Sequence, residues 1–152
     1  MKNIIGFIFL FVSVTVSAQN NPVEDTTAKP VITAIGKPDG AKSEMKIGKD
    51  GGSIISSDGK VRLIIPEGAV SKKTTFSIQP TTNLMQNGNG KAYQIEPSGV
   101  NFQKSLKIIF NYNNDDTQAN SPDLLGIAMQ DEKGQWSAPN KITTDTVAKI
   151  IT

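Results

Sequence analysis

The sequence predicts an all-β fold, an antiparallel β-sandwich of two sheets, and three observations support this prediction. Apolar residues recur at alternate positions in short runs. Clusters of Gly, Asp, Asn and Pro separate these runs at intervals of roughly eight to twelve residues. No window repeats apolar residues at i, i+3, i+4 and i+7 for long enough to form a helix. Strands of this kind bury one face each against a second sheet about 10 Å away.

The clearest local pattern is a predicted hairpin over residues 51–70, GGSIISSDGKVRLIIPEGAV. A Ser-Asp-Gly turn signal separates its two apolar runs. In the second run Val61, Leu63 and Ile65 alternate with other residues, as one face of a strand requires. Pro66 follows directly, and because proline lacks an N–H and has a fixed φ, it ends the strand.

Later segments predict further strands of the same kind, in a domain that we expect to span residues 45–152. Pro80 is expected to end the first of these strands, since proline cannot donate to a sheet ladder. The final run, Thr146 to Thr152, is expected to be a strand that the chain end interrupts, as in a domain truncated at its C-terminus. The predicted inward-facing residues of the remaining strands are Phe76 and Ile78, Tyr93 and Ile95, Leu106, Ile108, Phe110 and Tyr112, and Leu125, Ile127 and Met129.

The first 18 residues have the pattern of a secretory signal peptide. Lys2 gives a positive start, Ile4 to Val16 is apolar, and the small residues up to Ala18 form a cleavage site. The alternative is an uncleaved anchor, but the apolar run is shorter than the about 20 residues that span a bilayer. We therefore expect a secreted or otherwise extracytoplasmic protein of the cell envelope, with no membrane contact after cleavage.

Residues 19–44 are expected to form a flexible leader. Pro22, Pro30 and Pro38 lie there among mostly polar residues, and such a stretch buries little apolar surface. The short apolar run at Val31 and Ile32 adds at most one weak strand.

Composition excludes several classes of function. The chain has 152 residues, a formal net charge of +2, and neither His nor Cys. Without these residues there is no Ser-His-Asp arrangement, thiolate nucleophile, zinc site of the usual kind or disulfide. The charge includes no basic block for a nucleic acid to bind. We therefore predict no enzymatic activity, no cofactor, and no catalytic, cofactor-binding or metal-binding residues.

Three segments together resemble the ZU domain, the module shared by zonula occludens proteins, netrin receptors and ankyrins. They are SSDGKVRLIIPEGAV, TTFSIQP and YQIEPSGVNFQKSLKIIFNY, and the resemblance covers residues 45–151. The most specific part is the IPEGA segment from Ile65 to Ala69, followed by EPSG with Phe102. The chain is most similar to the versions in bacterial secreted and surface proteins. The resemblance implies a non-catalytic scaffold that binds other proteins. Some relatives cut their own backbone at a His-Phe-Ser segment, which this His-free chain lacks.

Two candidate ligand sites each have a structural alternative. The stretch Asn113 to Asp116, with Asp123 beyond it, offers the clustered oxygens that Ca²⁺ prefers. Its spacing matches no calcium loop, and Asn and Asp are also common in ordinary turns. Trp136, the only Trp, would stack on a sugar ring with Tyr93 or Tyr112 nearby, but large aromatics more often pack in a core.

Glu67 and Glu96 form a third candidate, a glycosidase pair, which requires two carboxyls about 5 to 10 Å apart in a cleft. Both residues lie next to Pro at predicted strand ends, where a solvated Glu is ordinary. The leading hypothesis is therefore a secreted, non-catalytic domain for protein–protein interaction, adhesion or spacing at the cell surface. The alternative is a glycan-binding module, so the expected partner is another protein or a surface glycan.

Overall fold

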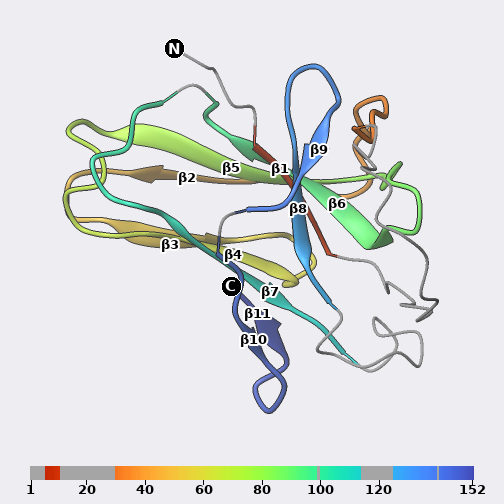
Figure 1. The fold of residues 1–152 in the computed structure, drawn as a ribbon. Coiled ribbons are helices and arrows are strands. Elements are labelled where there is room, and N and C mark those ends of the chain that lie inside the picture. Colours follow the sequence, from red (N-terminus) through yellow and green to blue (C-terminus); the bar gives the residue numbers. More distant parts are fainter. Residues whose placement is uncertain (1–5, 11–29, 99, 114–124, 140) are drawn as a thin grey trace, which may run out of the picture.

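The structure is a computed structural model, and it describes residues 6–10, 30–98, 100–113, 125–139 and 141–152. Every regular element in these residues is a β-strand, which confirms the all-β prediction (Figure 1). No helix in this part of the chain is long and apolar enough to cross a membrane. The strands are β1 Gly6–Leu10, β2 Ser43–Ile47, β3 Gly52–Ile55, β4 Val61–Ile65, β5 Thr74–Thr81, β6 Asn89–Glu96, β7 Lys107–Asn111, β8 Ile127–Gln130, β9 Trp136–Ser137, β10 Thr144–Asp145 and β11 Ile150–Ile151.

The strands form one six-stranded and one five-stranded sheet. The first has the order β2-β5-β6-β1-β8-β9 and the second the order β10-β11-β7-β4-β3. Neighbouring strands within each sheet pair antiparallel. In Figure 1, β2 and β5 lie above β3 and β4, and β1, β8 and β9 run across the view next to β6. Among the described strands, the edges of the sheets are β2 and β9, and β10 and β3.

The predicted hairpin over residues 51–70 forms as β3 and β4, with Ile54 opposite Leu63. The N–H of Ser56 donates to the carbonyl of Val61 at 2.8 Å and closes the turn. The glycine before the hairpin is required by space, because a Cβ on Gly51 would lie 2.5 Å from the Ile65 carbonyl oxygen. The sequence pattern therefore predicts the two strands and their turn correctly.

Strand β5 differs from its prediction, because it continues through Pro80 to Thr81. The carbonyl of Pro80 accepts a hydrogen bond from the N–H of Asp39 at 2.8 Å. In a strand the N and O of one residue point to the same side, so the proline nitrogen also faces Asp39. β2 pairs with β5 only as far as Ile78, so the missing N–H of Pro80 does not remove a hydrogen bond between β5 and β2.

The described part of the expected leader is bound to the domain instead of forming a flexible tether. The N–H of Thr33 donates to the Gly134 carbonyl at 3.0 Å, and the N–H of Trp136 donates to the Val31 carbonyl at 2.9 Å. The buried side chain of Gln130 donates to the Thr33 carbonyl at 2.9 Å. Strand β2 then begins at Ser43, two residues before the predicted domain boundary. A polar, proline-containing segment is thus held by backbone hydrogen bonds. Amino-acid composition does not predict such bonds, because every residue type can form them.

Both ends of the sequence contribute strands. Gly6–Leu10, inside the expected signal peptide, forms β1 and pairs with both β6 and β8. The final run is not one strand, since residues 146–149 form a turn between β10 and β11. The carboxylate of Asp145 accepts hydrogen bonds from the N–H groups of Val147 at 3.0 Å and Ala148 at 2.8 Å. This local bonding by an Asp side chain favours a turn over a strand.

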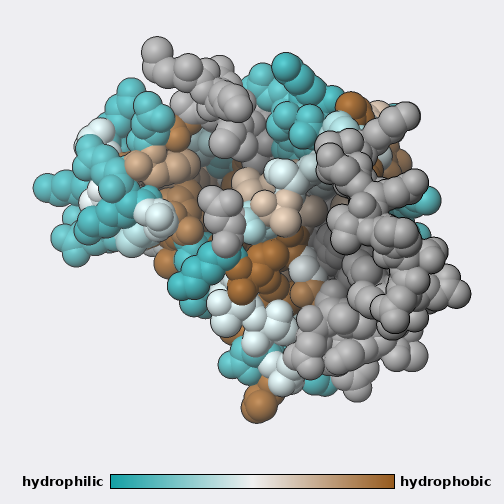
Figure 2. Space-filling view, viewed as in Figure 1, coloured by the Kyte–Doolittle hydropathy of each residue, from teal (hydrophilic) through white to brown (hydrophobic). Residues whose placement is uncertain are grey.

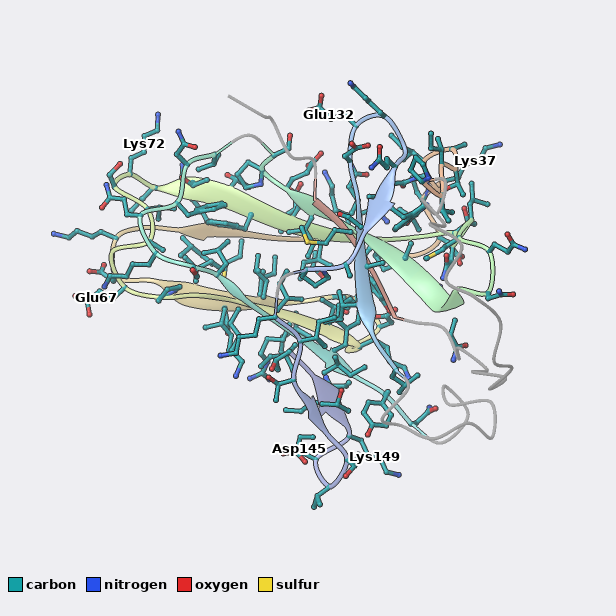
Figure 3. The ribbon with its side chains drawn as sticks, in the orientation of Figure 1. Lys37, Glu67, Lys72, Glu132, Asp145 and Lys149 are labelled. Carbon is teal, nitrogen blue, oxygen red and sulfur yellow. The ribbon has the colours of Figure 1, made fainter. Side chains whose placement is uncertain are left out.

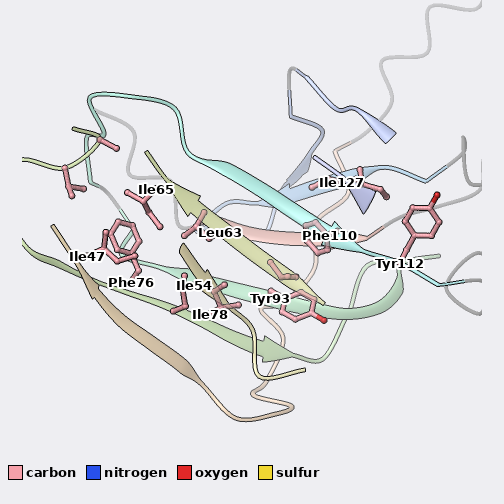
Figure 4. Close-up of a cluster of buried hydrophobic side chains, with 14 of the residues drawn as sticks. Ile47, Ile54, Leu63, Ile65, Phe76, Ile78, Tyr93, Phe110, Tyr112 and Ile127 are labelled. Atoms are coloured by element: carbon pink, nitrogen blue, oxygen red, sulfur yellow. The ribbon is translucent and has the colours of Figure 1, made fainter. Parts of the chain in front are cut away.

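One buried apolar cluster receives side chains from both sheets (Figure 4). Phe76 of β5 stacks on Phe102, with ring centroids 6.0 Å apart, and Tyr93 of β6 meets the ring of Phe110 of β7 edge-on at 5.9 Å. The inward-facing residues predicted for the later strands all belong to this cluster or pack against it. Its buried members are Ile47, Ile54, Val61, Leu63, Ile65, Ala69, Val70, Phe76, Ile78, Tyr93, Phe110, Tyr112, Leu125, Ile127 and Ile151.

Candidate functional site

The outer edge of β3 is a sheet edge without a pairing strand among the described residues. Strand β3 pairs with β4 on one side, and among the described residues no strand pairs with its other side. Ser56 bonds to Val61, and antiparallel pairs alternate between bonded and non-bonded, so the residues bonded to β4 are Ile54 and Gly52. The N–H and C=O groups of Ser53 and Ile55 therefore point away from the sheet.

The opposite side of β4 supports this assignment. The N–H of Asn111 donates to the Lys60 carbonyl at 2.8 Å, which makes Lys60 and Asn111 a bonded pair. By the same alternation, Arg62 and Ile64 bond to β7, which leaves the odd-numbered residues of β4 to bond to β3. Both ladders thus indicate one arrangement, in which β3 offers two outward donors and two outward acceptors.

Side chains leave the β3 edge unprotected. Residues 52–55 carry no charge, and the side chain of Ile55 is 41% exposed. The neighbouring edge strand β2 differs, because Lys42 beside it pairs with Glu44 at 3.3 Å and with Glu96 at 3.4 Å. Charged side chains on an edge discourage pairing with another chain, and an uncharged edge permits it. The two edges lie one above the other in Figure 1.

A cavity of about 300 Å³ opens near the turn of the same hairpin. The buried rings of Tyr93 and Phe110 are among the residues that line it. Asp58 accepts hydrogen bonds from the Ser56 hydroxyl at 2.6 Å and from the Tyr93 hydroxyl at 2.8 Å. The backbone N–H of Lys60 donates to the same carboxylate at 3.1 Å. The polar groups around Asp58 therefore hold the turn against β6, and Asp58 is an occupied acceptor instead of an available base.

The pKa of Asp58 is lowered. Partial burial acts to raise this pKa, but the hydrogen bonds from Ser56, Tyr93 and the local backbone outweigh burial. A carboxyl with a depressed folded-state pKa stabilises the fold above its unfolded pKa, and this contribution is lost as the pH falls through the folded-state value.

We expect Asp58→Asn to lower the free energy of unfolding at pH 7 by on the order of 1 kcal/mol, since the charged acceptor is lost at a solvent-exposed position. The deficit should shrink as the pH falls below the ordinary Asp pKa of 3.8, because the wild-type carboxylate then becomes protonated too. Urea unfolding of both proteins between pH 7 and pH 2.5 measures this difference. A deficit that stays constant over this range would show that the charge of Asp58 does not stabilise the turn.

The predicted sugar platform is not assembled. The exposed fractions of Trp136, Tyr93 and Tyr112 are 7%, 4% and 5%. Trp136 packs with Ala92 and Ala128 in a second small cluster, and its indole N–H donates to the Thr33 hydroxyl at 2.9 Å. Both tyrosines belong to the buried apolar cluster that receives side chains from both sheets. Core packing, the structural alternative for Trp136, is what the structure contains.

The acidic candidates are also not brought together. Glu96 accepts hydrogen bonds from Ser77 at 3.2 Å and from Lys42 at 3.4 Å. Glu67 lies in the turn after β4, and its side chain points outward in Figure 3. Of the candidate calcium stretch only Asn113 belongs to the described residues, and Asp115, Asp116 and Asp123 lie outside them. No group of three acidic residues suited to a metal ion occurs in the described part of the chain.

Sequence reasoning missed the β3 edge as a functional surface. The signal was present, because β3 lacks charged residues while β2 contains Glu44 and Lys46 and directly follows Lys42. Which strand lies at an edge depends on sheet order, and sheet order is not visible in the pattern of one hairpin. The chain matches no protein-family model, no curated protein and no solved structure.

Proposed function

We propose that the chain is a non-catalytic interaction module of the cell envelope or the extracellular space, and that a partner protein binds by adding a strand to β3. In this proposal the first 18 residues direct export and are cleaved, and the two sheets form a ZU-like β-sandwich. The larger buried cluster, which has side chains from both sheets, supports the sandwich. The signal-peptide pattern of the sequence supports export.

The β3 edge is the observation that carries the binding proposal. An added strand would form main-chain hydrogen bonds with Ser53 and Ile55, and alternate side chains of that strand would contact the exposed Ile55 side chain. Hydrophobic surface on the face shown in Figure 2 gathers between the two sheets, and hydrophilic atoms cover the turns at their left end. The partner is therefore an extended, uncharged segment with a backbone that is available for pairing.

Photo-crosslinking followed by binding measurements tests this proposal. A crosslinking amino acid replaces Ile55 in the exported protein, and the matched control carries it at Val147, which is 94% exposed on the β10–β11 turn. We expect a partner that is captured from position 55 and not from position 147. The purified partner should bind Ile55→Lys at least about tenfold more weakly than wild type, and Val147→Lys normally.

Ser53→Pro provides a second test, because it removes an outward N–H without removing a hydrogen bond to β4. We expect a melting temperature close to that of wild type and at least about tenfold weaker partner binding. Unchanged partner affinity in both Ile55→Lys and Ser53→Pro would contradict strand addition at β3.

The alternative function is glycan binding, and the cavity at Asp58 is the observation that favours it. Side-chain amides donate and accept hydrogen bonds as sugar hydroxyls do, and Asn89 and Asn111 line this cavity. A glycan array with wild type and Asn111→Ala separates the two functions. Glycan binding that Asn111→Ala abolishes and Ile55→Lys leaves intact would replace strand addition at β3 as the function.

A further inference from the structure

Strand β1 fills a central position in the six-stranded sheet. It pairs antiparallel with β6 on one side and with β8 on the other, so that Ile8 lies opposite both Tyr93 and Met129. β6 and β8 therefore run in the same direction and are separated by one strand width on each side of β1. Signal-peptide cleavage would remove β1 and leave a slot between two unpaired strand edges.

The walls of this slot are apolar on the inner face of the sheet, and on the outer face they are apolar at position 9 and polar at position 7, which lies opposite Gln94 and Gln130. On the inner face, Tyr93 is 4% exposed and Ile127 is 6% exposed, and Ile95 and Met129 pack against the same core. On the outer face, Ala92 and Ala128 pack with Trp136. A strand covered on both faces needs apolar residues at successive positions, unlike a strand with one solvated face.

The outer face of the sheet also determines the size of the side chain that the slot accepts. Position 9 of β1 lies opposite Ala92 and Ala128 at once. Two small side chains at the neighbouring register positions leave room for a large side chain between them. The slot therefore fits an extended, proline-free strand with successive apolar residues at positions 8 to 10 and a bulky residue at position 9.

The processed chain does not offer such a stretch to a second copy of itself. Residues 19–29, QNNPVEDTTAK, are polar and contain Pro22, and cleavage would remove β1 from every copy. The apolar runs of residues 30–152 lie mainly in the strands that already form the two sheets. We propose that, after export and cleavage, the slot between β6 and β8 accepts a donor strand of successive apolar residues from another polypeptide.

This inference rests on the export and cleavage proposed above, and β1 itself supplies the probe. The probe is a synthetic peptide with the sequence of residues 3–12, extended by Lys at both ends for solubility and carrying Ile8→Cys. The chain lacks Cys, so Met129→Cys in the exported, processed protein gives a single attachment point. Ile8 and Met129 are register partners. With the peptide thiol activated beforehand as its thionitrobenzoate disulfide, the Met129→Cys thiolate displaces thionitrobenzoate, and we expect a mixed disulfide between peptide and protein that intact mass detects.

Two controls make the crosslink specific. A peptide with Phe9→Cys in place of Ile8→Cys presents its thiol on the other face of the sheet, because one residue reverses the side-chain direction in a strand. It should react with Met129→Cys at least about tenfold more slowly. Val147→Cys, on the exposed β10–β11 turn, should react equally with both peptides, since it reports only random encounter.

Binding without a crosslink gives a second readout on the processed wild-type chain. The cysteine-free peptide should raise its melting temperature, and the same peptide with Ile8→Pro should not, because proline removes a ladder N–H. A processed chain that shows neither the preferential disulfide nor the stabilisation overturns the donor strand alone. An exported product whose mass still includes residues 1–18 overturns both the cleavage and the donor strand.

Discussion

Phe110→Asp is expected to unfold the domain. The Phe110 side chain is 1% exposed, lies opposite Val61 across β4 and β7, and contacts the edge of the Tyr93 ring. Removing a buried Phe costs about 3 to 5 kcal/mol, and an unpaired buried carboxylate adds a desolvation penalty. A typical domain has a free energy of unfolding of about 5 to 15 kcal/mol, and the two losses together approach this value.

Circular dichroism with thermal melting measures the effect of Phe110→Asp. The variant should lose the β-sheet signal and the cooperative transition at room temperature. Val147→Asp is the matched control, since the same new charge at a side chain that is 94% exposed should leave the melting temperature unchanged. A Phe110→Asp protein that melts like wild type would show that the core does not lie between β4, β6 and β7.

Gly51→Ala has the second-largest expected effect. Gly51 has a φ of 74°, and a Cβ there would lie 2.5 Å from the Ile65 carbonyl oxygen and 2.7 Å from the Glu67 nitrogen. Backbone atoms cannot move aside as a flexible side chain can. We expect a loss of about 3 kcal/mol or more, from the left-handed conformation together with the displacement of the β3–β4 end.

Gly59→Ala separates the two causes, because Gly59 has nearly the same φ of 73° and an added Cβ would meet no heavy atom within 4 Å. Gly59→Ala should lower the free energy of unfolding by only about 1 to 2 kcal/mol, which is the cost of the left-handed conformation. Urea unfolding of both variants gives the comparison. Equal losses would mean that the close approach of Gly51 to the Ile65–Glu67 backbone does not contribute.

The sequence is most informative where local chemistry decides the structure. The hairpin of β3 and β4 follows from a turn signal and from apolar alternation, both of which are short-range. The inward-facing residues of the later strands also follow from alternation. Successive side chains of a strand point to opposite faces of the sheet, so the face that carries the alternating apolar residues is the one that is buried. Phe76, Tyr93 and Phe110 are predicted to face inward for this reason, and each is at most 4% exposed.

The errors arise where distant contacts decide. Pro80 remains inside β5 because β2 has already ended beside it, and this depends on sheet order. The segment around Thr33 is held by Gln130 and Trp136, roughly a hundred residues further along the chain. Composition alone predicts a flexible leader there. The turn after Asp145 has a local signal, the Asp itself, but the apolar residues on both sides of it suggest one strand.

For a related reason, sequence patterns do not reveal the candidate binding surface. Strand addition depends on backbone groups, which every residue has, and on which strand lies outermost. Only the pairing of Ser56 with Val61 and of Asn111 with Lys60 shows that Ser53 and Ile55 face outward. By contrast, Trp136 attracts attention in the sequence and is buried in the structure.

Amide hydrogen exchange at single-residue resolution, measured by NMR on the dilute protein, tests the open β3 edge most directly. We predict that the amides of Ser53 and Ile55 exchange at least about a hundredfold faster than that of Ile54, which bonds to β4. Addition of the partner should then slow exchange at Ser53 and Ile55. Ser53 and Ile55 amides that are as protected as Ile54 in the isolated monomer would contradict an edge available for pairing.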